Sequence, residues 1–183
     1  MKKPSHFVYR NARYGFTLRF PAWWRTYAVI DRRRQSSDTE YELHFRFRYK
    51  GKVYDDALAI MVFHMTRQEW NREGYDDSPL IFLAEHGGRV FAYMTPEELP
   101  EAFYDPKTND YDYKRYGAAI RLLKRMVNQD APRIAGSIRF LPQANTARSV
   151  PYRAQHVCTA RTGDRGKQRC RNNGTKRSAS HRH

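Results

Sequence analysis

Imidazole and carboxylate side chains occur in two neighbouring segments of the chain. His44 lies in YELHFRFRY, and Asp55, Asp56 and His64 lie in the segment that follows it. If the two segments pair as a hairpin, these groups could share one face, an arrangement that general acid–base catalysis uses. However, alternation places His44 on a polar face, and paired acids ahead of a strand are usually solvated. We therefore name no catalytic residue, and whether the chain is an enzyme stays open.

Two further groups of side chains have the chemistry of metal ligands. Oxygen ligands for a hard cation gather after Pro100, but they lack the fixed spacing and central glycine of a calcium loop: Asp105, Asn109, Asp110 and Asp112. Near the C-terminus the thiols and imidazoles would suit zinc, but their spacing does not match that of paired zinc ligands: His156, Cys158, Cys170, His181 and His183. We therefore expect neither a metal nor another cofactor.

Strand patterns dominate the first half of the chain. In residues 16–20 apolar and polar side chains alternate, and Pro21 ends the pattern because proline cannot donate to a strand ladder. In residues 41–49 the same alternation predicts a half-buried strand, with aromatic residues and Leu43 on one face and Glu42, His44, Arg46 and Arg48 on the other. After a turn at residues 50–52, the continuous apolar run 57–63 predicts a strand covered on both faces, near the centre of a sheet.

A second hairpin and two helices complete the pattern. Residues 80–84 and 89–94 flank EHGG, whose glycines suit a turn; the histidine before them is only faintly like an oxyanion loop, and no G-x-S-x-G nucleophile motif accompanies it. Thr66 and Glu69 form a predicted capping box for a short helix ending near Gly74. Apolar residues spaced three and four apart predict a long helix over 113–127, which Pro132 interrupts, with a further turn capped by Asp130. SIRFL supplies a last short strand.

This order of elements predicts an α+β fold, an antiparallel sheet with a long C-terminal helix and a short helix packed on it. The opening GFTLRFPAWW and the closing SIRFL resemble an uncharacterised family of small bacterial proteins that open with G-F-x-L-x-F-P-x-x-W. That opening is also distantly similar to PsbP-like domains, so the resemblance implies an α-β-α sandwich. It implies no catalytic residue. Many members of the family are exported, which leaves an extracytoplasmic location as an alternative to the cytoplasmic one that the missing signal peptide favours.

The aromatic residues of the opening segment are expected in the core, because alternation and the family pattern both require apolar packing there. The adjacent Trp23 is the exception, and it is either a contact for a partner or packed on a neighbouring loop. Together with the polar face of the 41–49 strand, it gives the predicted partner-binding residues: Trp23, His44, Arg46 and Arg48.

The composition changes sharply near residue 142. Residues 143–183 hold no Leu, Ile, Phe, Met or Trp, and they carry +9 of the formal net charge of +15. A segment without large apolar side chains cannot offset the entropy of ordering, so we expect a disordered basic tail or an ending read out of frame. We therefore divide the chain of 183 residues into an N-terminal extension (1–13), one domain (14–142) and this tail.

Two function classes follow from the sequence. The first is a non-catalytic domain that binds an unidentified protein or ligand. The second is a binder of nucleic acid or an anionic surface, acting through counterion release by the basic tail: Arg161, Arg165, Lys167, Arg169, Arg171, Lys176 and Arg177. No stretch is apolar enough to predict a membrane span.

Overall fold

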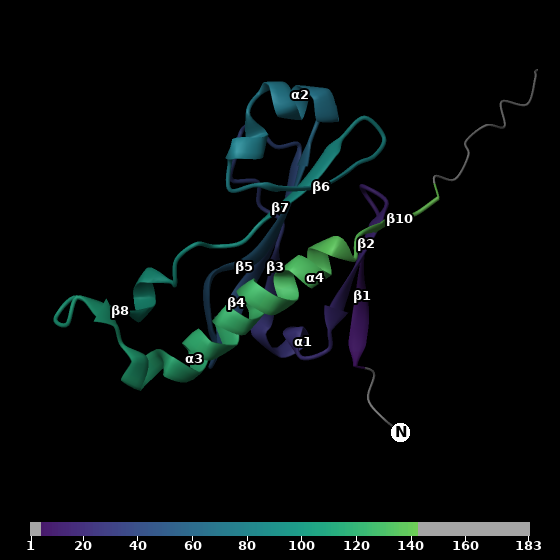
Figure 1. The fold of residues 1–183 in the computed structure, drawn as a ribbon. Helices are drawn as coiled ribbons and strands as arrows, with labels where there is room; N and C mark the ends of the chain where they lie inside the picture. Colours follow the sequence, from purple (N-terminus) through teal and green to yellow (C-terminus); the bar gives the residue numbers. More distant parts are fainter. Residues whose placement is uncertain (1–4, 143–183) are drawn as a thin grey trace, which may run out of the picture. The chain divides into compact units, whose positions relative to one another are not determined.

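The computed structural model describes residues 5–142, which form two antiparallel sheets and a long helical segment (Figure 1). The strand order is β3-β4-β5-β7-β6 in the larger sheet and β1-β2-β10 in the smaller one, and β8 and β9 form a small separate hairpin. These elements confirm the α+β class. The strands are β1 (His6–Asn11), β2 (Phe16–Pro21), β3 (Ala28–Asp31), β4 (Tyr41–Tyr49), β5 (Lys52–Phe63), β6 (Ile81–Glu85), β7 (Val90–Met94), β8 (Tyr104–Asp105), β9 (Asp110–Tyr111) and β10 (Arg139–Phe140).

The helical elements are short except near the end of the described chain. Thr66 and Glu69 form the predicted capping box at the start of α2. None of the helices in residues 5–142 is long and apolar enough to cross a membrane. They are α1 (Trp24–Tyr27), α2 (Arg67–Arg72), α3 (Tyr113–Arg125), α4 (Ala131–Gly136), the 3-10 turns η1 (Tyr75–Asp77) and η2 (Glu101–Phe103), and the π-helical turn η3 (Met126–Asp130).

The hairpin of β4 and β5 lies at the centre of the larger sheet, as predicted. Its turn places Lys50 and Gly51 at φ values of 48° and 79°, and two successive positive φ angles suit the twist of a tight hairpin. Residues 57–63 of β5 are buried on both faces, as the continuous apolar run predicts.

One face of the larger sheet packs against β2 and against the long helical segment that α3, η3 and α4 form together. Phe20 of β2 lies 4.6 Å from Phe45 of β4 between ring centroids, and Phe16 lies 5.8 Å from Phe91 of β7. From the helical segment, the core takes Ala119, Ile120, Leu123, Met126, Ile134 and Ala135. The aromatic residues of the opening segment therefore hold the two sheets together.

Part of the opposite face of the larger sheet is also covered, which corrects the prediction of a half-buried β4 at Glu42 and His44, whereas Arg46 and Arg48 stay partly exposed. The α2 side chain of Trp70 packs on Phe63, and both lie in a second apolar cluster. The segment 32–40 lies along β4, where Glu42 is 0% exposed and His44 is 2% exposed. Alternation in a single strand indicates only which residues are polar, and the segment 32–40 just before β4 has no regular pattern that would predict its course over the strand, so the polar face could be mistaken for a solvated one.

The helical segment continues through Pro132, where an interruption was predicted. The π turn η3 precedes the proline, which lies in the first turn of α4. A proline within a helix lacks the N–H for an i−4 bond and its ring crowds the carbonyl four residues back, so a wider turn at this point accommodates it. Asp130 makes no capping bond, contrary to the prediction, and instead accepts a hydrogen bond of 2.9 Å from Trp24 Nε1.

The N-terminal extension predicted at residues 1–13 instead contributes a strand to the fold, because β1 begins at residue 6. Its six residues pair one-to-one with β2. On the other side of β2, β10 pairs with Phe16 and Thr17, and Leu141 N donates to Gly15 O. The smaller sheet thus joins both ends of the described chain. The expectations for the basic tail concern residues outside the described ones.

Candidate functional site

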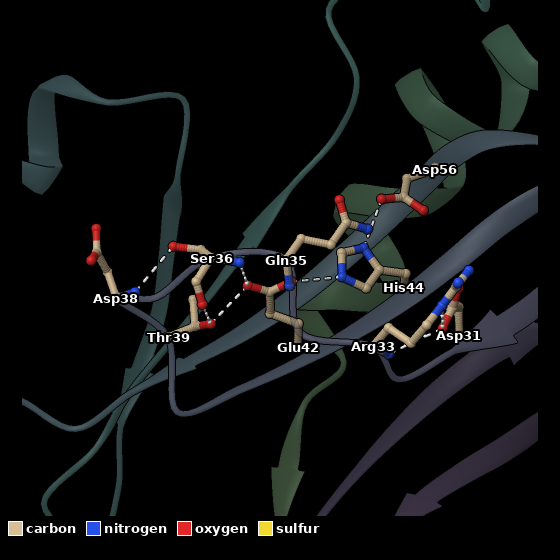
Figure 2. A network of polar contacts seen from close by, with 9 residues as sticks. All are labelled: Asp31, Arg33, Gln35, Ser36, Asp38, Thr39, Glu42, His44 and Asp56. Carbon is tan, nitrogen blue, oxygen red and sulfur yellow. Dashed lines mark hydrogen bonds and ion pairs between the residues drawn. The ribbon is translucent and has the colours of Figure 1, made fainter.

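His44 lies between two carboxylates beneath the segment 32–40 (Figure 2). Its Nδ1 is 2.7 Å from Asp56 Oδ2, and its Nε2 is 2.9 Å from Glu42 Oε2. An ionised carboxylate only accepts hydrogen bonds, so two ionised partners require both ring nitrogens to donate, which is the arrangement of an imidazolium. The hydrogen bond to Asp56, together with that to Glu42, raises the pKa of His44 despite its burial.

Glu42 connects this ring to the segment above it. Its carboxylate accepts from Gln35 N at 2.7 Å, Ser36 N at 2.8 Å and Thr39 Oγ1 at 2.7 Å (Figure 2). Burial opposes ionisation of Glu42, but these hydrogen bonds outweigh it and hold the pKa below its usual range. The network fastens the covering segment to β4 and leaves His44 no free nitrogen for proton transfer to a substrate.

The other acid and histidine considered for catalysis do not complete a site with His44. His64 follows the last residue of β5 and is exposed, whereas His44 is opposite Ala59 in the β4–β5 register. Asp55 is exposed and lines a hollow of about 380 Å³ with Asp56 and Arg46. Of the four groups, the structure therefore joins only His44 and Asp56.

The four predicted partner-binding residues do not form one surface. His44 is buried by the segment 32–40, so its ring is not available to a partner at the surface. Arg48 is partly exposed and donates to the carbonyls of Arg25 and Thr26, which fastens α1 to β4. Trp23 is half-buried, with the guanidinium carbon of Arg125 4.8 Å from its ring centroid.

The acidic stretch after Pro100 uses its oxygens within the chain. Asp105 accepts from Lys107 N at 3.0 Å, Asp110 from Tyr111 N at 2.7 Å, and Asp112 caps α3 by accepting from Arg115 N at 2.8 Å. Within residues 5–142 no three His, Cys, Asp or Glu side chains are arranged to hold a metal ion. The predicted ligands for zinc lie outside these residues.

Two joined hollows lie where the β1–β2 turn meets the β6–β7 turn and the segment 32–40. Their volumes are about 520 Å³ and 410 Å³, and both are lined by Arg10, Ala12, Arg13 and Glu40. Arg89 also lines the first, and Arg32 and Arg34 the second. We call this site the arginine cleft, and define it by Arg10, Arg13, Arg32, Arg34 and Arg89 with Tyr9, Tyr14 and Tyr41.

Glu40 is the acid at the junction of the two hollows, and Arg89 neutralises it. The guanidinium makes two contacts with the carboxylate, Nε to Oε2 at 2.7 Å and Nη2 to Oε1 at 3.1 Å. The Tyr14 hydroxyl donates to the same carboxylate at 3.3 Å. The hydrogen bonds from Arg89 and Tyr14 lower the pKa of Glu40, so it is ionised and already engaged at neutral pH.

The remaining four arginines of the cleft carry charge that no acid of the described chain balances. No carboxylate oxygen in residues 5–142 lies within 4.0 Å of a guanidinium nitrogen of these four. Arg13 lies over the rings of Tyr14 and Tyr41, at 5.3 Å and 5.9 Å from their centroids. The hydroxyls of Tyr9 and Tyr41 lie beside Arg32 and raise its pKa. The second acid of this cleft, Glu42, is engaged by His44.

The sequence expectations name none of these five arginines. The signal that could have indicated them is the pair of basic runs RNAR and RRR, each at the end of a strand that was not expected, β1 or β3. Arg89 follows a predicted turn. The arginine cleft forms where the β1–β2 turn, the segment 32–40 and the β6–β7 turn meet. Periodicity within one segment cannot predict that these segments come together.

None of the family models, curated proteins or solved structures with which the chain was compared matches it. The resemblance of the opening and closing strands to a bacterial family, and to PsbP-like domains, therefore stays a prediction. The function proposed below is therefore based on the geometry of the arginine cleft.

Proposed function

We propose that this chain is a non-catalytic binding domain whose ligand places carboxylate or phosphate groups in the arginine cleft. The observation that carries the proposal is the meeting of four arginines without a carboxylate partner in the described chain at two joined hollows. The proposal keeps the predicted class of binding module and adds to it a site and a chemical preference.

Electrostatics favours an anionic ligand at this place. Guanidinium groups gathered at one cleft repel one another, and an anion between them relieves that repulsion while gaining charge-assisted hydrogen bonds. The fork of a guanidinium matches the two oxygens of a carboxylate or phosphate. Tyr9, Tyr14 and Tyr41 add ring faces and hydroxyls that hold the arginine side chains in place.

The side chains near the cleft favour binding over catalysis. His86 lines the first hollow, but its ring stacks on Phe140 at 4.1 Å between centroids, and no acid of the described chain orients it as a general base. His44 contacts Glu42, which lines the second hollow, but both of its ring nitrogens are engaged by carboxylates. A general base must reach the proton that it abstracts, and neither imidazole is arranged to do so.

The test is a calorimetric titration of the full chain with pyrophosphate at low and moderate salt. Replacing two guanidiniums, Arg13→Gln with Arg32→Gln, should weaken binding by tenfold or more, since charge-assisted hydrogen bonds contribute about 1.5 to 3 kcal/mol each. The matched control is Arg72→Gln on α2, whose guanidinium pairs with Glu73 at 3.1 Å and does not line either hollow of the cleft. Its affinity should equal that of the unmodified chain.

The basic segment 143–183 remains in the protein in this experiment, so the double substitution separates binding by the arginine cleft from binding by that segment. Affinity that survives Arg13→Gln with Arg32→Gln would belong elsewhere in the chain and would overturn the proposal. An affinity that falls with the double substitution but not with Arg72→Gln supports binding in the arginine cleft.

A further inference from the structure

β1 forms one edge of the smaller sheet, and its register shows which backbone groups face outward. Ser5 O accepts from Ala22 N, and the one-to-one pairing then runs from His6–Pro21 to Asn11–Phe16. Hydrogen-bonded pairs alternate along an antiparallel ladder, so the backbone groups of residues 7, 9 and 11 face β2. Those of His6, Val8 and Arg10 face away from it. Pro21, which has no N–H, is accordingly opposite an outward-facing residue.

This outer edge has no backbone partner within residues 5–142. The N–H and C=O groups of Val8 and Arg10 make no hydrogen bond to any described residue. The side chain of Val8 is 64% exposed, and those of His6 and Arg10 beside it are exposed too. Native proteins usually block pairing at such an edge with charge. Here the charge is basic, so it blocks basic strands and admits acidic ones.

The arginine cleft begins at the same edge. Tyr9, Arg10 and Asn11 of β1 line the second hollow, and Arg32 and Arg34 line it from the chain that follows β3. Residues directly opposite one another in a sheet point to the same face. A strand added to β1 would therefore point every second side chain the same way as Phe7, Tyr9 and Asn11, whose side chains face the larger sheet.

We propose that the ligand of the arginine cleft is an extended acidic segment of a partner protein that adds to β1 as a further strand. This inference rests on the proposed function and names its ligand class. Alternate acidic side chains of the segment meet Arg13, Arg32 and Arg34 of the cleft, while the side chains between them lie beside Val8 and Arg10 on the outer face. Backbone pairing along residues 6–10 supplies the rest of the contact.

An acidic segment uses both the outward backbone groups of β1 and the arginines of the cleft beside it. A small anion would engage the guanidiniums but would leave the outward N–H and C=O groups of His6, Val8 and Arg10 in water. A neutral strand would pair with the edge but would bring no charge to the four arginines. The period of two in a strand places carboxylates on the cleft side only when they alternate with other residues.

The first experiment uses a capped heptapeptide in which Asp alternates with Val and Thr, titrated into the full chain. Two further peptides have the same sequence, one N-methylated at the odd amides and the other at the even amides. A strand presents only one of these two sets to its neighbour, so one methylated peptide should bind at least tenfold more weakly than the other. Binding of the unmethylated peptide should fall by tenfold or more with Arg13→Gln and Arg32→Gln.

The second experiment alters the protein at the edge. Val8→Pro removes an outward N–H without removing a bond to β2, and proline is tolerated on the solvent side of an edge strand. The variant should bind the peptide more weakly but bind pyrophosphate with unchanged affinity. If Val8→Pro lowers the melting temperature, strand addition is still tested by the comparison of the methylated peptides, which uses the unmodified protein.

The outcomes separate this inference from the proposed function. Equal binding of the two methylated peptides would overturn strand addition and leave the anion-binding cleft standing. Cleft-dependent binding of pyrophosphate or an oligonucleotide, without binding of the peptide, would overturn the acidic segment alone. Absence of cleft-dependent binding for all of these probes would overturn both.

Discussion

His44 stabilises the fold through charge, because each of its ring nitrogens is fixed by a carboxylate. Removing the ring leaves Glu42 ionised, fully buried and without its cationic neighbour. Removing one partner of a buried ion pair destabilises a protein by about 3 to 5 kcal/mol, much more than the pair itself contributes.

We therefore expect His44→Gln to lower the free energy of unfolding by about 3 to 5 kcal/mol near pH 6, measured by urea titration. Arg33→Gln is the control, because Arg33 pairs with Asp31 at 2.7 Å but is mostly exposed, and solvent screening makes such a pair contribute little to stability. Similar losses for the two variants would show that burial adds nothing to the pairing of His44.

The same network predicts how stability depends on pH. The folded state raises the pKa of His44, mainly through its hydrogen bond to Asp56, so its contribution is complete below the unfolded value of about 6.5 and is lost as the pH rises through the folded value. The folded state lowers the pKa of Glu42, so its contribution is present above about 4.5 and is lost at acid pH. Urea midpoints should therefore be highest between about pH 5 and 6.5. The difference between the unmodified chain and His44→Gln should narrow as the pH rises, and parallel curves would contradict the assignment.

Among the elements, α1 is held to the helical segment by the bond from Trp24 to Asp130 at the π turn. Trp24→Ala should lower the free energy of unfolding by about 3 to 5 kcal/mol, as large truncations in a core do. Asp130→Ala should lower it by about 1 to 3 kcal/mol, because it leaves the buried indole N–H without an acceptor. Trp23→Ala, at a half-buried position, should have a smaller effect than Trp24→Ala. Equal losses for both tryptophans in urea titrations would show that the division between them is wrong.

The elements that the sequence predicts well are those with local signals. The capping box of α2, the hairpin of β4 and β5 and the amphipathic pattern of α3 each depend on residues a few positions apart. β1 and β3 have weak patterns of their own and form because neighbouring strands pair with them. The arginine cleft requires segments distant in sequence, and Glu42 is buried by the connection just before β4, which has no regular period, so periodic patterns predict neither.

For the whole molecule, the pairing of β1, β2 and β10 and the packing of the two sheets are formed by contacts within residues 5–142. A chain ending at Pro142 should therefore unfold within a few degrees of the full chain in a thermal melt. Because residues 143–183 carry +9, the shortened chain should bind RNA or DNA far more weakly than the full chain. The affinity of the full chain for RNA or DNA should fall steeply as the salt concentration rises. Equal affinities would assign nucleic-acid binding to residues before 143, and a large fall in melting temperature would contradict the division of the chain.

The position of β2 between β1 and β10 has a consequence for synthesis on the ribosome. β2 is complete by residue 21, yet β10 begins at residue 139. A nascent chain can form the β1–β2 hairpin early, but one side of β2 has no neighbour until almost the whole described chain has been translated. During that interval Phe16, Leu18 and Phe20 also lack the helical segment that later covers them. The early hairpin therefore leaves these three apolar side chains without their final neighbours for most of translation, and slower translation lengthens that interval.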